Sequence, residues 1–319
     1  MATPNPLKNT PPTSSVSEKT FHIAGILTTV YGLEEVSPSS LSISCLWLLH
    51  PRLQTKKIME NVASSCIQAW NQQSGANRTV GLIAVAFDQR NHGRHVQYIP
   101  WNSHGHQPPD RPSTLLHLQH PRLPSIEQHL VMGISLGGHA AWQVLFADPR
   151  VTAGIVIIGC PDYMRVMTDR ARLSKLQTYT STQGATFPGS KDFPPALLAS
   201  LRKWDPKGIL FGSADIDPAP QQARYKPLLD QKLKGKRILV CSGADDKLVP
   251  YHCSEPFTRF LTNAAGGWYQ EGELYVEDKV YPGVGHAFSD GMLDDTVRFV
   301  NETLAGKPDA DLLVGQAKI

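Results

Sequence analysis

Apolar residues recur along the chain in two alternating patterns. Nearly continuous apolar runs of five to nine residues predict strands buried on both faces of a sheet, at residues 41–49, 80–87, 152–158 and 237–241, and a last strand is predicted at residues 274–281. Stretches with apolar residues at helical spacing separate them, at residues 56–72, 140–146, 255–263 and 292–304. Residues 21–31 alternate as a strand pair does. This alternation predicts an α/β fold with a mostly parallel central sheet and helices on both faces.

Four segments depart from this rhythm. Residues 1–18 are rich in Pro, Ser and Thr, and we expect a disordered lead-in. Residues 97–124 carry six prolines where a crossover helix is expected, so we predict an irregular Pro/His-rich segment. Residues 161–236 mix short helical patches with turns and are interpreted as a small cap. The main domain would therefore span residues 19–305, followed by a tail at 306–319.

A Gly-x-Ser-x-Gly sequence carries the first chemical signal. Gly133, Ser135 and Gly137 lie where an apolar run turns into a helical pattern, which is typical of a nucleophile elbow. Glycines two residues before and after the serine avoid the collision that such a sharp turn forces. We expect the turn to expose the Ser135 hydroxyl and the new helix to present free N–H groups to an oxyanion.

A serine nucleophile needs a histidine base and an acid that orients the base. Asp245 and Asp246 follow the strand predicted at 237–241, and His286 follows the strand predicted at 274–281. The chain order is therefore Ser, Asp, His, and the carboxyl ends of parallel strands would bring the three groups together. Each group alone is compatible with an ordinary surface turn, but their joint occurrence favours a catalytic triad.

These segments resemble the α/β-hydrolase superfamily, specifically its fungal-type esterase-like members, over roughly residues 20–305. The resemblance implies an α/β-hydrolase fold, with Ser135 as nucleophile and His286 as base. In the family pattern Gly-x-x-Asp-x-x-Val-Pro the acid falls three residues after the glycine, which implies Asp246 and leaves its neighbour Asp245 as an alternative. Asp162 occupies a second acid position that some members of the superfamily use.

The oxyanion hole is expected at two backbone positions. Its first donor would be the N–H of Leu136, directly after the nucleophile. Its second would come from the loop His50-Pro51-Arg52-Leu53, where the family commonly has His-Gly. Pro51 has no N–H, so donation falls to Arg52 or Leu53. The Arg52 side chain could alternatively bind a carboxylate or phosphate of the substrate.

Composition narrows the possible partners. The net charge is +3, from 31 basic and 28 acidic residues, and no long basic block is present, which argues against a nucleic-acid partner. No apolar run is long enough to cross a bilayer and no signal core is evident, so we expect a soluble, cytoplasmic protein. The ending Ala317-Lys318-Ile319 resembles variants of a peroxisomal signal and leaves the peroxisomal matrix as an alternative. The oligomeric state is undetermined.

Neither a metal nor a cofactor is implied by the sequence. The five cysteines lack Cys-x-x-Cys spacing and are interpreted as reduced core residues, including Cys253 beside His252. Seven of the twelve histidines lie between residues 92 and 129, but carboxylate or cysteine companions at ligand spacing are missing. We therefore predict no metal site.

The leading hypothesis is a carboxylesterase-like or thioesterase-like serine hydrolase of EC class 3.1 that acts on a small ester-like substrate through an acyl-enzyme. Two alternatives remain open. One is a C–C bond hydrolase or lyase that uses the same triad, and the other is a non-catalytic ligand-binding pseudoenzyme. Dehalogenase and epoxide-hydrolase activities are excluded because they need a carboxylate where the chain has Ser135.

Overall fold

The computed structural model describes residues 5–7, 15–73, 79–90, 92, 123–217 and 221–306. Its centre is an eight-stranded sheet with the order β1-β2-β4-β3-β5-β6-β7-β8. β1 pairs antiparallel with β2, and β2 pairs antiparallel with β4. The other six strands, β3 to β8, run parallel to one another. The strands are β1 (Glu18–Ile23), β2 (Ile26–Tyr31), β3 (Ser42–Leu49), β4 (Val80–Phe87), β5 (Ser125–Ile134), β6 (Val151–Ile157), β7 (Arg237–Gly243) and β8 (Tyr275–Tyr281).

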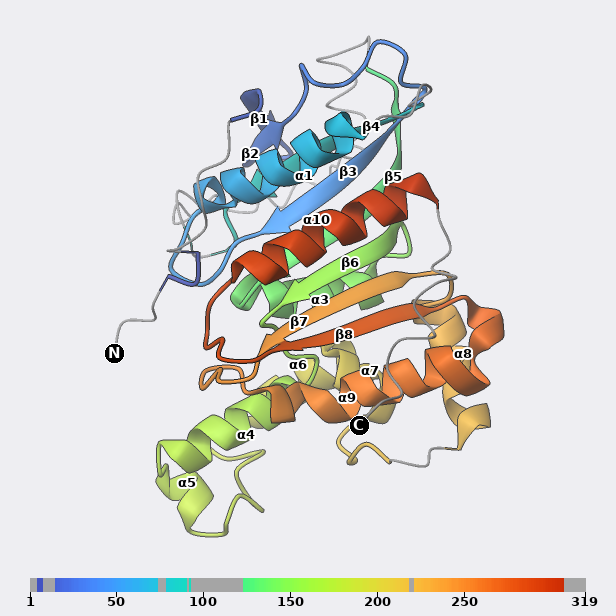
Figure 1. Cartoon of the computed structure of the whole chain (residues 1–319). Coiled ribbons are helices and arrows are strands. Elements are labelled where there is room, and N and C mark those ends of the chain that lie inside the picture. The colour runs from blue at the N-terminus through green and yellow to red at the C-terminus, as the bar shows by residue number, and fades with distance from the viewer. Residues whose placement is uncertain are drawn as a thin grey trace, which may run out of the picture.

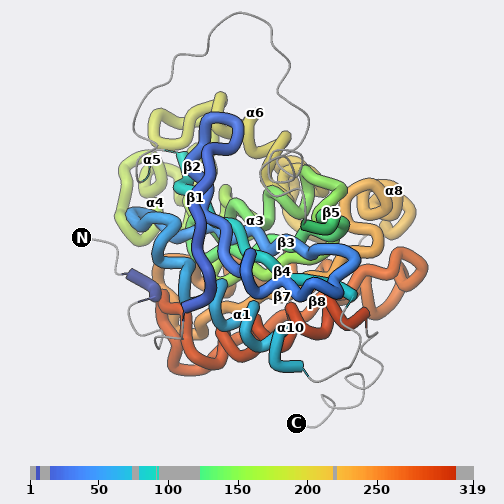
Figure 2. Tube along the Cα trace, turned by 90° about the horizontal axis from the view of Figure 1, so that it is seen from above, coloured from blue at the N-terminus to red at the C-terminus, as the bar shows by residue number. Residues whose placement is uncertain are grey.

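Helices cover both faces of this sheet (Figures 1 and 2). α1 (Glu60–Gln72), which continues the short 3-10 helix η1 (Lys56–Met59), and α10 (Asp290–Ala305) pack on one face. α3 (Leu136–Ala147), α7 (Pro206–Phe211), α8 (Gln222–Lys232) and α9 (Tyr251–Asn263) pack on the other, and η3 (Ala264–Trp268) and η4 (Gln270–Gly272) follow α9. The α/β prediction is thus confirmed.

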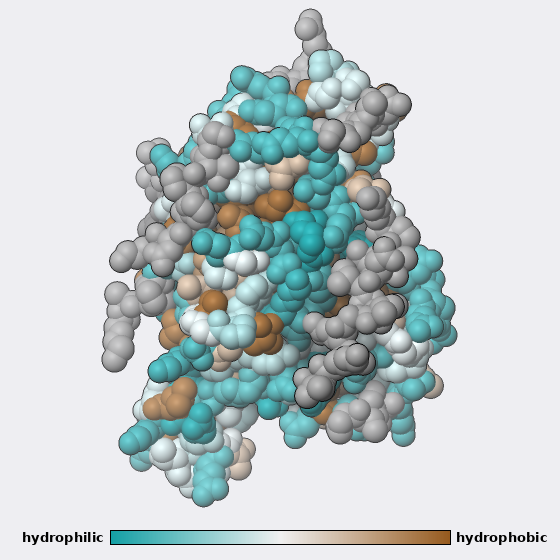
Figure 3. All heavy atoms as spheres, viewed as in Figure 1, coloured by the Kyte–Doolittle hydropathy of each residue, from teal (hydrophilic) through white to brown (hydrophobic). Residues whose placement is uncertain are grey.

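Each face has its own apolar core because successive residues of a strand point to opposite sides. In β5, Leu130 and Met132 pack under α1 and α10, whereas Val131 packs under α3. The side of the molecule formed by α1 and α10 is mostly hydrophilic, with small separate apolar patches (Figure 3). Within the described residues, no helix is both long enough and apolar enough to span a membrane.

The range predicted as a cap divides into two parts. α4 (Tyr163–Leu173), α5 (Gln177–Thr180) and α6 (Pro195–Trp204) enclose a small cluster of their own, around Phe187 and Phe193. α4 and α5 project from the sheet in Figure 1. Phe211 of α7 and Leu229 of α8 instead belong to the core beneath α3, so residues after 204 serve the main domain.

The N-terminal segment is not a uniformly disordered lead-in, and the expectation for it is wrong at the described residues 5–7 and 15–18. Leu7 and Val16 are buried in the core beside α1 and α10. The Val16 N–H donates to Ser64 Oγ over 3.4 Å, and the Phe288 N–H donates to the Pro6 carbonyl over 2.8 Å. Composition averaged over the segment concealed these two apolar anchors. Nearly all of the predicted irregular segment, residues 97–122, and the tail at 307–319 lie outside the described residues.

A buried carboxyl group at the junction between α6 and α7 gives a pH-dependent prediction. Asp205 caps α7, accepting from the N–H groups of Gly208 and Tyr163, and burial is the main reason that its pKa is raised to about 7. The folded state therefore holds this proton more tightly than the unfolded chain, and the associated stability is lost as the pH rises from about 4 to 7. Asp205→Asn keeps an acceptor oxygen without the charge.

We expect Asp205→Asn to be more stable than wild type at pH 8, and the difference in free energy of unfolding should be about 2 to 3 kcal/mol larger at pH 8 than at pH 5. Urea unfolding at both pH values measures the difference. A variant less stable than wild type at pH 8 would contradict the assignment.

Candidate active site

Ser135 lies at a sharp turn between β5 and α3. Its backbone has φ 56° and ψ −110°, a conformation that is unfavourable for a residue with a side chain. The turn is held at both ends, because the Ser135 N–H donates to the Ile157 carbonyl over 2.9 Å and the His139 N–H donates to the Ser135 carbonyl over 3.0 Å. These bonds place the hydroxyl at the carboxyl edge of the sheet.

Glycines make this turn possible. A Cβ at Gly133 would lie 1.9 Å from the Gly137 carbonyl oxygen, and a Cβ at Gly137 would lie 2.0 Å from the Leu49 carbonyl oxygen. The second approach brings the start of α3 against the end of β3. Gly138 and Gly159, which the motif does not include, pack against each other in the same way, with 2.5 Å between a Cβ at Gly159 and the carbonyl carbon of Gly138.

Ser135, His286 and Asp246 form a continuous chain of hydrogen bonds. Ser135 Oγ is 2.8 Å from His286 Nε2, and His286 Nδ1 is 2.8 Å from Asp246 Oδ2. The His286 side chain is 6% exposed and that of Asp246 is fully buried. A carboxylate only accepts, so Nδ1 carries the proton toward Asp246, and in the neutral imidazole Nε2 is left as the acceptor for the serine hydroxyl.

The parallel sheet brings these three groups together from distant positions. Ser135 follows β5, Asp246 follows β7 and His286 follows β8, all at the same edge of the sheet. The last two loops are also joined directly, since the Asp245 N–H donates to the Val284 carbonyl over 2.9 Å. A Cβ at Gly243 would lie 2.4 Å from that same carbonyl oxygen, so the close approach requires glycine.

Of the three candidate acids, only Asp246 is hydrogen-bonded to His286 among the described residues. Asp245 is exposed to solvent. Asp162 is buried and caps α4, where its carboxylate accepts from the Arg165 N–H over 2.9 Å. Burial is the main cause of the raised pKa of Asp162.

Backbone amides and one arginine hold Asp246 in place. Its Oδ1 accepts from the N–H groups of Leu248 and Val249, over 2.8 and 2.9 Å. The Leu248 carbonyl in turn accepts from Nε and Nη2 of Arg170 in α4, over 3.1 and 2.7 Å. No sequence motif indicated Arg170, which lies 76 residues before Asp246.

The loop after β3 lies beside the first turn of α3, where Leu136 begins the helix. Leu53 in this loop has φ 62°, and Arg52 and Leu53 are both exposed. The buried His50 ring holds the loop, because its Nε2 accepts from the Gln89 N–H over 2.9 Å and its Nδ1 is 2.8 Å from the Pro51 carbonyl. Burial is the main cause of the lowered pKa of His50, which favours the neutral ring.

His139 is a further histidine near the elbow. Its ring is buried, its Nδ1 lies 2.9 Å from the Cys160 carbonyl, and burial is the main reason that its pKa is lowered to about 4. It remains neutral at physiological pH and packs edge-on against Tyr163. His139 lies four residues after Ser135, which places it one helical turn away. This spacing could have indicated from the sequence that His139 lies near the nucleophile.

Comparison with known proteins identifies the family. A model described as the alpha/beta hydrolase family matches residues 68–302. The chain belongs to the alpha/beta hydrolase family. A search of the curated proteins finds no match.

Among solved structures, this hydrolase fold is similar to TT1662 from Thermus thermophilus, with a TM-score of 0.53 and 18% identity over 92% of this chain and 99% of that one. It is also similar to the peroxisomal alpha-beta-hydrolase Lpx1 from Saccharomyces cerevisiae, with a TM-score of 0.50 and 14% identity over 96% of this chain and 94% of that one. At these identities the likeness concerns the fold.

Proposed function

We propose that the protein is a serine hydrolase that cleaves a carboxylic ester or thioester of a small molecule. The observation that carries this proposal is the hydrogen-bonded chain from Ser135 through His286 to Asp246. Ser135 Oγ attacks the acyl carbonyl carbon while His286 Nε2 takes its proton. His286 then gives that proton to the leaving alcohol or thiol, and Asp246 stabilises the imidazolium that forms between the two steps.

Water completes the cycle. His286 removes a proton from a water molecule, the resulting hydroxide attacks the acyl-enzyme carbonyl, and the acid leaves as Ser135 Oγ regains its proton. In both steps the developing oxyanion would be stabilised by the Leu136 N–H and by an N–H of Arg52 or Leu53. The nucleophile and base are both side chains of this chain, so the proposed reaction needs no cofactor.

A panel of p-nitrophenyl acyl esters of increasing chain length, together with matched thioesters, tests the proposal. We expect saturable turnover of at least one member and a preference for one range of chain length. Absence of turnover across the panel, in folded protein, would contradict hydrolase activity and favour the ligand-binding alternative.

Arg170 is proposed as a positioning residue. The Leu248 carbonyl that it binds and the Val249 N–H that binds Asp246 belong to one peptide unit. The guanidinium polarises this unit and strengthens the bond to the carboxylate.

We expect Arg170→Met to lower kcat about tenfold, equivalent to about 1.4 kcal/mol, with little change in KM. Arg170→Lys should recover part of the loss. Steady-state kinetics measure the effect. Arg202→Met is the matched control, because Arg202 in α6 makes a similar pair of hydrogen bonds, to Ser213 Oγ and not to the loop that carries Asp246. A change in KM alone would contradict the proposed role.

A further inference from the structure

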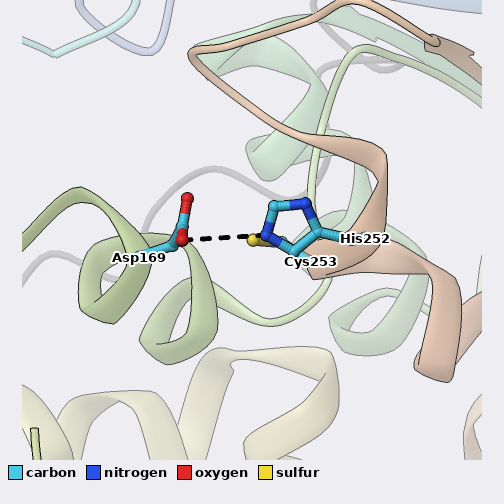
Figure 4. A group of neighbouring side chains, drawn as sticks. All are labelled: Asp169, His252 and Cys253. Carbon is cyan, nitrogen blue, oxygen red and sulfur yellow. Dashed lines mark ion pairs between the residues drawn. The ribbon is translucent and has the colours of Figure 1, made fainter. Parts of the chain in front are cut away.

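A group of three potential metal ligands lies where α4 meets α9. Asp169 comes from α4, and His252 and Cys253 come from the first turn of α9. One ligand atom from each lies within 4.8 Å of the other two. Figure 4 shows the Asp169 carboxylate pointing toward the Cys253 sulfur and the His252 imidazole.

The spacing of these atoms suits a tetrahedral ion. His252 Nε2 is 3.7 Å from Asp169 Oδ1. Around a four-coordinate zinc ion, with bonds of about 2.0 Å to nitrogen and oxygen and about 2.3 Å to sulfur, neighbouring ligand atoms lie about 3.3 to 3.6 Å apart. Small side-chain movements would therefore bring the three donors into a coordination shell, and the exposed His252 ring is free to make one.

From this geometry we infer a binding site for a zinc-class transition-metal ion, formed by Asp169, His252 and Cys253. Thiolate, imidazole and carboxylate together select zinc or a similar borderline ion over magnesium or calcium, which prefer oxygen ligands alone. Three protein ligands leave the fourth position for water. A cavity of 380 Å³, which these three side chains help to line, provides room for that water and a route of entry.

The charges around the site are mixed, because Arg165 and Arg170 lie close enough to act on Cys253 and Arg172 binds Asp169. A thiolate and a carboxylate would balance its two positive charges. The oxygen that faces His252, Asp169 Oδ1, already accepts from Nε and Nη2 of Arg172, over 3.0 and 2.7 Å, so the carboxylate would have to rotate and offer its other oxygen to the ion while Oδ1 keeps Arg172. The metal would replace the thiol proton of Cys253, releasing one proton to solvent for each ion bound.

An ion at this place would link the cap to the loop that carries Asp246. Asp169 is adjacent to Arg170, which binds the Leu248 carbonyl, and α9 begins directly after that loop. Binding should therefore raise the melting temperature of the folded chain, because the ion binds the folded site and joins α4 to α9.

Zinc titration of the full-length, tag-free chain tests this inference. Affinity is measured by competition with a chromophoric chelator, and proton release is measured by calorimetry in two buffers of different ionisation enthalpy. We expect one site whose affinity falls at least tenfold in Cys253→Ser and in His252→Ala. The site should also release about one proton per ion in wild type, and Co²⁺ should show a thiolate charge-transfer band that Cys253→Ser lacks.

Matched controls separate this site from the many other histidines of the chain. Cys66→Ala, at a buried cysteine of α1, and His22→Ala, at an exposed histidine of β1, should both keep the wild-type affinity. His252 is exposed, so His252→Ala should fold normally. If Cys253→Ser does not fold, the zinc affinity of His252→Ala alone tests the inference. No zinc binding by wild type, or equal affinity in wild type and His252→Ala, would overturn the inference. These readouts do not depend on hydrolase activity.

Discussion

Replacing Ser135 by alanine is expected to lower ester turnover by at least about 10⁴-fold, because the side chain that forms the acyl-enzyme is removed. The fold should be unchanged, since the serine hydroxyl is hydrogen-bonded to His286 and the turn depends on backbone bonds and glycines. Turnover of a p-nitrophenyl ester, with circular dichroism of both proteins, measures the effect.

Ser125→Ala is the control for this experiment. Ser125 begins the same strand, is exposed, and donates to the neighbouring Glu127, far from the site. It should retain wild-type activity. Turnover by Ser135→Ala within tenfold of wild type would show that another group is the nucleophile.

Asp246→Asn is expected to lower kcat by about 10⁴-fold through a change of tautomer. The amides of Leu248 and Val249 would still bind the side-chain oxygen, so the loop would keep its place. The new NH₂ group would face His286 Nδ1 and donate to it. The imidazole proton would then move to Nε2, which faces Ser135 Oγ. A protonated Nε2 can only donate, so it cannot accept the hydroxyl proton.

The neighbouring carboxylate provides a closely matched control. Asp245 is exposed and contributes its backbone N–H, which Asp245→Asn retains. We therefore expect Asp245→Asn to keep most of the wild-type kcat, measured on the same ester at a pH near 8. Equal loss in the two variants, or greater loss in Asp245→Asn, would contradict the assignment of Asp246 as the acid.

Much of the fold could be predicted from the sequence because the central strands are buried on both faces. Runs such as residues 80–87 leave a clear apolar signal, and the structure has β4 at the same residues. The lead-in was misjudged for the opposite reason. Leu7 and Val16 are single apolar residues within a polar segment, and a compositional average cannot show that each one fills a place in the core.

Local motifs indicated Ser135 and His286, and the family pattern favoured Asp246, but only the structure shows the contact that distinguishes Asp246 from Asp245. Asp245 and Asp246 are adjacent in sequence and differ in which way the turn points them. The contributions of Arg170 and of Asp169 depend on contacts with residues about 80 positions later, at Leu248 and at His252. Such pairs leave no periodic signal, so the sequence did not indicate that Asp169, His252 and Cys253 lie close together.

The proposed mechanism requires that the surroundings of Ser135 make its hydroxyl reactive. Treating the folded full-length chain with a fluorophosphonate probe and mapping the adduct by peptide mass spectrometry tests it most directly. We expect one phosphonyl group, attached to Ser135, and much slower labelling in His286→Ala. An unlabelled protein, or an adduct on any other residue, would contradict it.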